Sequence, residues 1–354
     1  MNLFDHVDKR KPGFKLALIG TVLAVFVLGL GAFTRLADAG LGCPDWPGCY
    51  GHMFWPDSAT DVEKANQLFP DTPVEHDKTW PEMVHRYFAM TLGFISVMLV
   101  ALAVKYRSPT QPLKLPIFML GFIILQGMFG MWTVTLKLWP QIVTAHLLGG
   151  FSTFSLYWLL TLRLSNQHWQ LPADIFEKVS ALKKWALLGL VIVACQVALG
   201  GWTTSNYAAV ACPDLPTCQN QWLPVMNFAQ GFDIFQAIGP NYLGGTMENE
   251  SRIAIHFSHR IGAIITTIYI VLLAFMLLRV GPHSATQRMA KILLIMLSLQ
   301  VLLGLGNILL KFPLAIAVAH NLGGAFLLLV LVTLNYKLQT SRCLSTTHTT
   351  HTSH

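Results

Sequence analysis

Long apolar segments alternate with shorter polar segments over most of the chain. Eight of the apolar segments exceed the roughly 20 residues that a helix needs to cross a bilayer. The period-two alternation of a membrane β-barrel is absent, so helices are the only structure that satisfies the backbone groups in lipid. The pattern predicts an all-α integral membrane protein with helices at 14–36, 81–105, 113–136, 141–163, 182–205, 252–279, 288–310 and 314–337.

Composition agrees with this class. Hydrophobic residues make up 53% of the chain and charged residues only 12%, whereas a soluble domain carries about 25% charged residues. The formal net charge of +7 is compatible with nucleic-acid binding. However, the basic residues are dispersed between apolar segments and form no dense patch. We therefore expect membrane lipid, and no nucleic acid, as a partner.

The first apolar segment resembles a secretory signal, because basic residues precede it and Ala37-Asp38-Ala39 follows it. Its apolar stretch is longer than the about 7–15 residues of a signal core. It also has a counterpart in the middle of the chain. We therefore expect a retained membrane helix.

The charge distribution predicts the orientation. With the N-terminus in the cytoplasm, 16 of the 24 Lys and Arg residues lie on that side and 13 of the 17 Asp and Glu residues lie on the other. The positive-inside rule thus places both termini in the cytoplasm. The long loops 37–80 and 206–250 then face the periplasm of a bacterial inner membrane.

Each outward loop carries the same cysteine frame, CPDWPGC at 43–49 and CPDLPTC at 212–218. Disulfides persist in the periplasm. We therefore expect Cys43 to pair with Cys49, and Cys212 to pair with Cys218, as two closed loops that arose by duplication.

The cysteine frames belong to a longer internal repeat. A shift of 169 residues superposes the two frames and also places Gly31 on Gly200. A shift of 174 residues superposes AHLLGG (145–150) on AHNLGG (319–324) and places Gln126 on Gln300. Two halves with the same insertion direction should be related by an axis along the membrane normal. The predicted organisation is an N-terminal four-helix bundle (1–165), a cytoplasmic linker (166–181), a C-terminal four-helix bundle (182–340) and a disordered tail (341–354).

The repeat also brings out four histidines, His85, His146, His259 and His320, in the second and fourth helix of each half. Ionisable residues within membrane helices are rare and usually functional. Two histidines at one depth in a bundle can ligate a single metal, and histidine is a standard axial ligand of haem. Zinc requires three or four clustered ligands. A hydrogen bond to a neighbouring helix is the plainer explanation of one histidine, but four in register favour two haem sites.

Four further ionisable residues leave alternatives open. Arg86 and Arg260 directly follow ligand candidates, and they either extend to the interface or pair with haem propionates. Glu82 precedes His85 by three residues and serves either as a proton-transferring group or as an exposed carboxylate at a helix start. His256 is an alternative to His259 as a ligand, although the His-Arg pair shared with His85-Arg86 favours His259.

Taken together, several segments resemble the haem A synthase family, the membrane enzymes of cytochrome oxidase cofactor assembly. The resemblance covers about residues 14–337 and is carried by GAFTRLADAGLGCPDWPGC, EMVHRY, QGMFGMWTV, TAHLLGG, CPDLPTC, HFSHRIGA and AHNLGG. It implies that the N-terminal half binds the substrate haem O through His85 and His146, with Glu82 as an essential acid. It also implies that His259 and His320 hold haem b in the C-terminal half. The implied reaction oxidises the C8 methyl group of haem O to a formyl group by successive hydroxylations.

The resemblance implies a haem O synthase as the donor of substrate. The electron donor is not readable from the chain, which has no nucleotide fingerprint, and a homo-oligomer is possible. A bis-histidine dihaem cytochrome for electron transfer and a haem carrier are the alternatives. The cytochrome is disfavoured because all four histidines lie toward one side of the membrane.

Overall fold

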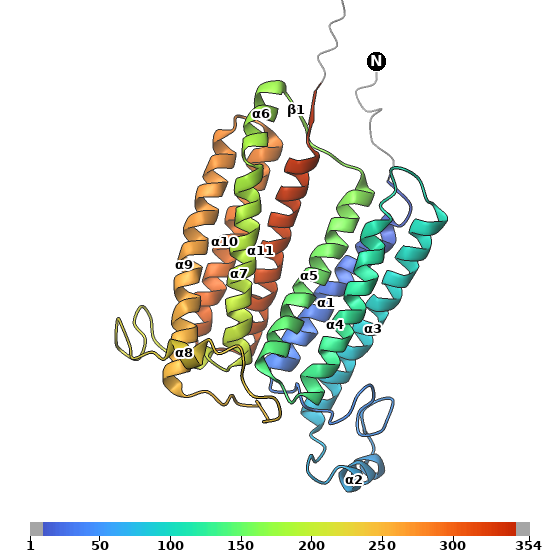
Figure 1. The fold of residues 1–354 in the computed structure, drawn as a ribbon, viewed down its shortest axis with the longest axis vertical. Helices are drawn as coiled ribbons and strands as arrows, with labels where there is room; N and C mark the ends of the chain where they lie inside the picture. The colour runs from blue at the N-terminus through green and yellow to red at the C-terminus, as the bar shows by residue number, and fades with distance from the viewer. Residues whose placement is uncertain (1–9, 345–354) are drawn as a thin grey trace, which may run out of the picture.

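The computed structural model describes residues 10–344 as a set of long, nearly parallel helices (Figure 1). Within that part of the chain, eight helices are long and apolar enough to cross a membrane. Those of the first half are α1 (Phe14–Leu36), α3 (His76–Lys105), α4 (Lys114–Thr135) and α5 (Pro140–Ser165). Those of the second half are α7 (Lys183–Ser205), α9 (Asn249–Arg279), α10 (Ser284–Leu309) and α11 (Leu314–Thr340). The predicted all-α membrane architecture is confirmed.

Shorter elements lie outside the spans. The first long loop contains α2 (Ala59–Leu68), and the second contains the 3-10 turn η1 (Ala209–Ala211) and α8 (Phe228–Gly231). Between the halves, β1 (Gln170–Leu171) precedes α6 (Ala173–Ala181) and pairs in parallel with β2 (Arg342–Cys343). The tail predicted as disordered from residue 341 therefore starts with an ordered pairing. Its remainder, 345–354, lies outside the described residues.

Helix α3 begins five residues before the predicted start at 81 and contains Pro81 within it. The added turn is polar, and Asp77 in it interacts favourably with the helix dipole. As a result, Glu82 lies past the first turn of α3, and only 5% of its surface is exposed. The reading of Glu82 as a water-exposed carboxylate at a helix start is therefore wrong.

The two halves make matching contacts. In the first half, α1 packs on α3 and α5, and α4 packs on the same two helices; in the second half, α7 and α10 each pack on α9 and α11. Between the halves, α5 packs on α7 and α1 packs on α11, while α5 and α11 contact each other. Two repeats related by a two-fold axis that passes between α5 and α11 would produce these reciprocal contacts.

The main buried cluster includes residues of both halves, and side chains of α5 and α11 meet across the interface between them. Phe154 of α5 meets Phe326 of α11 edge to face at 5.7 Å between ring centroids. The indole of Trp158 donates to the hydroxyl of Thr333 at 2.7 Å. Aromatic contacts and an interhelical hydrogen bond are the forces that hold membrane helices together, since lipid is as apolar as the helices. The core thus fixes α5 and α11, which carry two of the four histidines.

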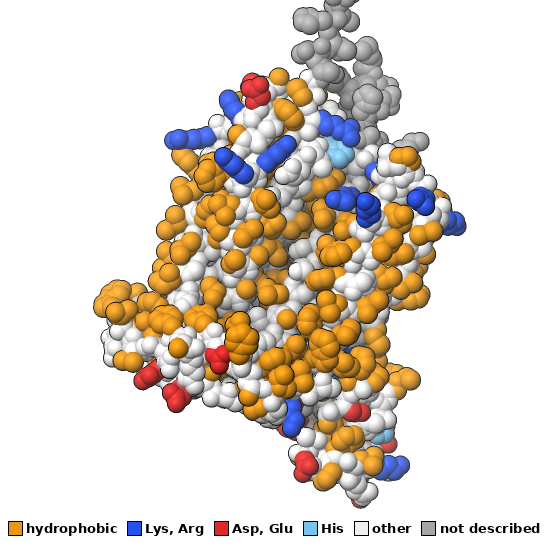
Figure 2. Space-filling view, in the orientation of Figure 1, with side chains coloured by type: hydrophobic (Ala, Val, Ile, Leu, Met, Phe, Trp, Pro, Cys, Tyr) orange, Lys and Arg blue, Asp and Glu red, His pale blue; other side chains and the backbone are white. Residues whose placement is uncertain are grey.

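The outer faces of the bundle are apolar, as a lipid-facing surface requires (Figure 2). In Figure 2, Lys and Arg gather at the end where the N-terminus leaves the bundle, and most visible Asp and Glu lie at the opposite end, around the long loops. This is the charge distribution that the sequence predicted, seen on the folded molecule.

Candidate functional site

All four histidines lie in the part of the bundle nearest the two long loops. His146 and His320 occur about two turns into α5 and α11, and His85 and His259 about three turns into α3 and α9. The latter two lie further into their helices, because α3 and α9 start earlier than the apolar pattern indicated. All four residues are partly exposed.

His85 and His146 face each other across the N-terminal bundle. Their ring centroids are 6.3 Å apart and the ring planes are inclined by 85°. One metal ion bonded to a nitrogen of each ring, at about 2 Å, separates the centroids by about 6 Å. The pair therefore fits an iron with two axial imidazoles. Among residues 10–344, no group of three or more His, Cys, Asp or Glu residues could hold a metal ion.

Each histidine ring lies against a glycine of the neighbouring helix. A Cβ atom added to any of these glycines would lie 2.9–3.3 Å from Cε1 of the facing ring. A larger residue would therefore displace the imidazole. The pairs are Gly31 with His85, Gly130 with His146, Gly200 with His259, and Gly304 with His320.

Glutamine side chains hold two of the rings from the same neighbouring helices. The amide Nε2 of Gln126 lies 3.0 Å from Nδ1 of His146 and donates to the carbonyl oxygen of that residue at 2.7 Å. Gln196 makes the same two contacts with His259, at 3.1 Å and 2.9 Å. Each glutamine thus fixes a ring and its helix backbone together.

The other two histidines differ from this arrangement. Gln300 places its Nε2 3.5 Å from Nε2 of His320, so this ring is turned relative to the others. His85 has no glutamine; its Nδ1 lies 3.1 Å from the backbone carbonyl oxygen of Val27 on α1.

Sequence reasoning missed the role of these glutamines and glycines, although the signal was present. Gln126 and Gln300 coincide in the 174-residue shift, and Gly31 and Gly200 coincide in the 169-residue shift. A glutamine followed four residues later by the ring-facing glycine would have identified Gln196 as well. These residues were recognised as part of the repeat, but no function was assigned to the glutamines.

Both predicted disulfides are present. Cys43 and Cys49 are bonded with a Cα–Cα distance of 4.8 Å, and Cys212 and Cys218 with a distance of 4.7 Å. Inside the first loop, the carboxylate of Asp45 accepts hydrogen bonds from the backbone amides of Tyr50 and Gly51.

The second loop has the same internal support. The Asp214 carboxylate accepts from the amides of Gln219 and Asn220 and from the Thr217 hydroxyl. These hydrogen bonds, that of Thr217 first, lower the pKa of Asp214. The aspartate of each cysteine frame thus stabilises the loop in which it lies through hydrogen bonds to backbone amides.

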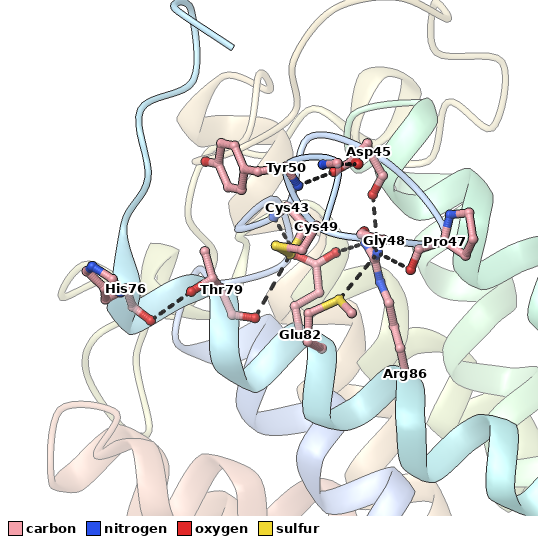
Figure 3. Close-up of a disulfide and its surroundings, with 12 residues drawn as sticks. Cys43, Asp45, Pro47, Gly48, Cys49, Tyr50, His76, Thr79, Glu82 and Arg86 are labelled. Atoms are coloured by element: carbon pink, nitrogen blue, oxygen red, sulfur yellow. Dashed lines mark hydrogen bonds and ion pairs between the residues drawn. A yellow bond between two sulfur atoms is a disulfide. The ribbon is translucent and has the colours of Figure 1, made fainter. Parts of the chain in front are cut away.

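An arginine fastens the first loop to the bundle (Figure 3). From α3, Arg86 extends upward and donates through Nη1 to the carbonyl oxygens of Asp45, Pro47 and Gly48, at 3.2, 3.1 and 2.6 Å. The sequence suggested that Arg86 extends to the interface or pairs with a propionate. The structure gives it the carbonyl groups of the disulfide loop.

Arg260 does the same in the second half. Its guanidinium donates to the carbonyl oxygens of Cys212, Asp214 and Thr217, at 2.7, 2.9 and 2.8 Å. Its Nε is buried without a hydrogen-bond partner among the described residues. The arginine that follows a histidine ligand candidate therefore connects that histidine's helix to the disulfide loop above it.

Glu82 adds a contact that exists only in the first half. Its carboxylate pairs with Arg86 and accepts a hydrogen bond from the backbone amide of Cys43 at 3.1 Å (Figure 3). The 174-residue shift places His256 at the corresponding position of α9. His256 is 4% exposed, and its Nδ1 has no hydrogen-bond partner within residues 10–344. The halves therefore share their four histidines, their disulfide loops and the arginines that bind those loops, but they differ at the position of Glu82 and His256.

Comparison with known proteins identifies the family. The COX15-CtaA family model, described as cytochrome oxidase assembly protein, matches residues 14–332. The heme A synthase of Shewanella oneidensis is 45% identical over 320 residues, which cover 90% of this chain and 94% of that protein. The heme A synthases of Allorhizobium ampelinum and Caulobacter vibrioides are 28% and 25% identical, covering 92% and 93% of this chain and 90% and 97% of the relatives. The chain therefore belongs to the COX15-CtaA family of cytochrome oxidase assembly proteins, the haem A synthase family.

Proposed function

We propose that this protein, an enzyme of haem A biosynthesis, oxidises the C8 methyl group of haem O to the formyl group of haem A by successive hydroxylations and loss of water. The observation that carries the proposal is the His85–His146 pair. Its 6.3 Å ring separation suits one iron, and its half of the molecule also contains the buried carboxylate of Glu82.

The two halves have different tasks in this proposal. The N-terminal half binds haem O through His85 and His146 and releases haem A. The C-terminal half holds a resident haem b through His259 and His320, which supplies one-electron transfer when bound. The difference at Glu82 and His256 supports this division, because methyl oxidation consumes and releases protons whereas electron transfer needs only a fixed iron.

Within the substrate half, each residue has a role that its contacts support. His85 and His146 bind and orient the substrate iron. Glu82 holds or moves a proton at its carboxylate while its contact with the Cys43 amide keeps that carboxylate in place. A propionate contact of Arg86 and Arg260 stays a prediction; their present contacts support a role in holding the disulfide loops.

We further propose that the protein lies in the bacterial inner membrane with both termini in the cytoplasm and both disulfide loops in the periplasm. The segregation of basic and acidic side chains to opposite ends supports this orientation (Figure 2). A haem O synthase in the same membrane is the expected donor of substrate. Purification of the protein from that membrane would also recover a bound electron donor or a second copy of the chain.

The test is expression in a host that makes haem O but no haem A, followed by acid extraction and chromatography of the pigments. The expected result is haem A beside haem b. Haem b alone would support an electron-transfer cytochrome, and haem O that accumulates on the protein without oxidation would support a carrier. Either of these two outcomes would overturn the proposal.

A further inference from the structure

Both disulfide loops carry an exposed apolar tip at the same place in the repeat. The 169-residue shift that superposes the cysteine frames also places Met53 on Trp222 and Phe54 on Leu223. The exposed fractions of Met53, Phe54, Trp222 and Leu223 are 79%, 61%, 75% and 75%. Clusters of exposed large apolar side chains mark surfaces that meet a membrane or another protein. The repeat therefore contains two equivalent surfaces whose partner has to be identified.

A tight hairpin presents each tip. Cys49 and His52 exchange two backbone hydrogen bonds, at 2.9 and 3.0 Å, and Cys218 and Gln221 exchange theirs at 3.0 and 3.1 Å. The two residues at each turn have positive φ, 55° and 75° in the first loop and 52° and 61° in the second, as in a type I′ turn. Because disulfide and hairpin already order the segment before the tip, binding of the tip costs little further conformational entropy.

The tips lie in segments without formal charge. Residues 46–56 and 215–232 contain no Asp, Glu, Lys or Arg, whereas the rest of the first loop, 57–80, contains eight such residues. A surface that faces water normally carries charged side chains, and a charged side chain within a bilayer is costly. The two uncharged segments thus have the composition that insertion into lipid requires.

The first tip continues the lipid-facing side of α3. The hydroxyl group of Tyr87 donates to the carbonyl oxygen of Met53. The ring centroids of Phe54 and Tyr87 are 5.6 Å apart. Directly after Tyr87, α3 exposes Phe88 and Met90 on the apolar exterior of the bundle. The tip and this part of α3 therefore form one apolar surface.

The lengths of the helices place both loops at the boundary of the membrane. From Tyr87 to Lys105 in its last turn, α3 rises by about 27 Å, and α9 rises by about the same distance from Ile261 to Arg279. The hydrocarbon core of a bilayer is about 30 Å thick. With Lys105 and Arg279 at one boundary, Tyr87 and Ile261 lie at the other, where aromatic side chains are enriched.

The second tip is directed toward lipid as well. Arg260, the residue before Ile261, binds the carbonyl oxygens of Cys212, Asp214 and Thr217 and so holds this loop at the same depth. The segment between η1 and α8 extends sideways past α9 (Figure 1), and hydrophobic side chains cover this projection (Figure 2). Its exposed large apolar residues are Trp222, Leu223 and Val225. A sideways projection at this depth meets lipid rather than the aqueous phase.

We infer that the two disulfide loops are membrane-interface anchors, whose tips insert into the leaflet on the loop side of the bilayer. The inserted residues are Met53 and Phe54 in the first loop and Trp222, Leu223 and Val225 in the second. Since Arg86 and Arg260 bind the loops from the helices of His85 and His259, the anchors hold these histidines at a fixed depth, within one helical turn of the boundary. This gives the loops a role beyond the proposed function.

Fluorescence quenching in lipid locates the tips. The purified full-length protein, in a Cys195→Ser, Cys343→Ser background, receives Phe54→Cys or Leu223→Cys, is labelled with the fluorophore NBD and is placed in phosphatidylcholine nanodiscs. Both labels should be quenched by nitroxide lipid and protected from iodide, at a depth of about 5–10 Å into the headgroup and acyl boundary. The matched controls are Glu63→Cys and Glu248→Cys, at exposed charged positions of the same two loops.

The controls should show the opposite pattern, with strong quenching by iodide and little by nitroxide lipid. A tip label that behaves like the control of its own loop would face water, where a soluble protein partner could bind it. Such a result would overturn the anchoring of that loop.

A conservative variant covers the case in which an added cysteine disturbs a disulfide. The difference in tryptophan emission between wild type and Trp222→Phe belongs to Trp222. In nanodiscs of brominated phosphatidylcholine, this difference should be strongly quenched relative to nanodiscs of the unbrominated lipid. An unquenched difference would contradict insertion of the second tip.

These measurements read the position of the loops and require no bound haem. Tips that face water in a protein that still makes haem A would overturn the anchoring alone. Inserted tips in a protein that makes no haem A would leave the anchoring intact and overturn the proposed function.

Discussion

Glu82 is the residue at which the two halves differ most in chemistry. Glu82 is buried, forms an ion pair with Arg86 and accepts a hydrogen bond from the Cys43 amide. These contacts hold its carboxylate against the disulfide loop. A buried ion pair is weak evidence for stability alone, because desolvation offsets most of its attraction. Its presence in one half, with His256 at the corresponding position of the other, supports the proposal that the N-terminal half has a task of its own.

Glu82→Gln tests that task. The side chain keeps its size, but its single oxygen can accept from only one of the two donors, the Cys43 amide or Arg86. The disulfide and the contacts of Arg86 with the loop carbonyls remain, so the loop should stay closed while proton transfer is lost. Haem A yield should fall about 10²-fold or more, with haem b content unchanged, as measured by pigment chromatography. Glu75→Gln, at an exposed carboxylate that pairs with Lys78, is the control. Full haem A yield from Glu82→Gln would remove Glu82 from the mechanism.

Single substitutions can also test whether His256 or His259 is the ligand in the C-terminal half. The ring of His259 contacts both Gln196 and Gly200 of α7. His256 is buried, and its Nδ1 has no hydrogen-bond partner within residues 10–344. His259→Ala should therefore lose the low-spin optical spectrum of haem b, and His256→Ala should keep it. The reverse pattern of spectra would assign the ligand to His256.

At the scale of elements, the disulfide loops and the helices below them form connected units. Each loop is closed by its aspartate and joined to α3 or α9 by an arginine. Local sequence predicted the cysteine pairs, because both frames are short and repeated. It did not predict the arginine contacts, because the partners lie 38 to 48 residues away along the chain.

The second loop should respond to acid. The pKa of Asp214 is lowered in the folded loop, chiefly by the Thr217 hydroxyl and also by the amides of Asn220 and Gln219. A lowered folded pKa stabilises the loop above the unfolded value of about 3.9, and this support is lost as pH falls through the folded pKa.

Amide hydrogen exchange measures this effect. Protection factors at Gln219 and Asn220 should be high at about pH 6 and fall as the pH drops through the lowered pKa of Asp214, below the unfolded value of about 3.9. In Asp214→Asn they should be low and nearly independent of pH over that range. Equal protection in the variant and wild type at about pH 6 would show that the carboxylate does not order the loop.

The position of α3 illustrates a second limit of sequence reasoning. Pro81 suggested a helix start, since proline is common at the first helical position. The helix instead begins at His76, because the polar turn before the proline is ordered above the membrane segment. Apolar periodicity carries no information about such a turn. The error was small in residues but changed the environment assigned to Glu82.

At the scale of the whole molecule, the duplication accounts for most of what was predictable. The apolar pattern located the eight spans, and the two shifts related the four histidines and the two cysteine frames to one another. The reciprocal contacts of α5 with α7 and of α1 with α11 follow the same symmetry. What the sequence left open is how the copies diverge, because that depends on which side chains face one another. The roles of Val27 and Glu82, for example, follow only from their contacts with His85 and with the Cys43 loop.

The most direct test of the central claim, one substrate half and one resident half, is the pigment composition of two matched variants. His146→Ala and His320→Ala remove equivalent ligands from α5 and α11. The purified proteins should be compared by haem content per chain and chromatography of the extracted haems. The account predicts that His146→Ala keeps haem b and loses haem O and haem A, whereas His320→Ala loses haem b. Full retention of haem b in His320→Ala, or identical losses in both variants, would contradict it.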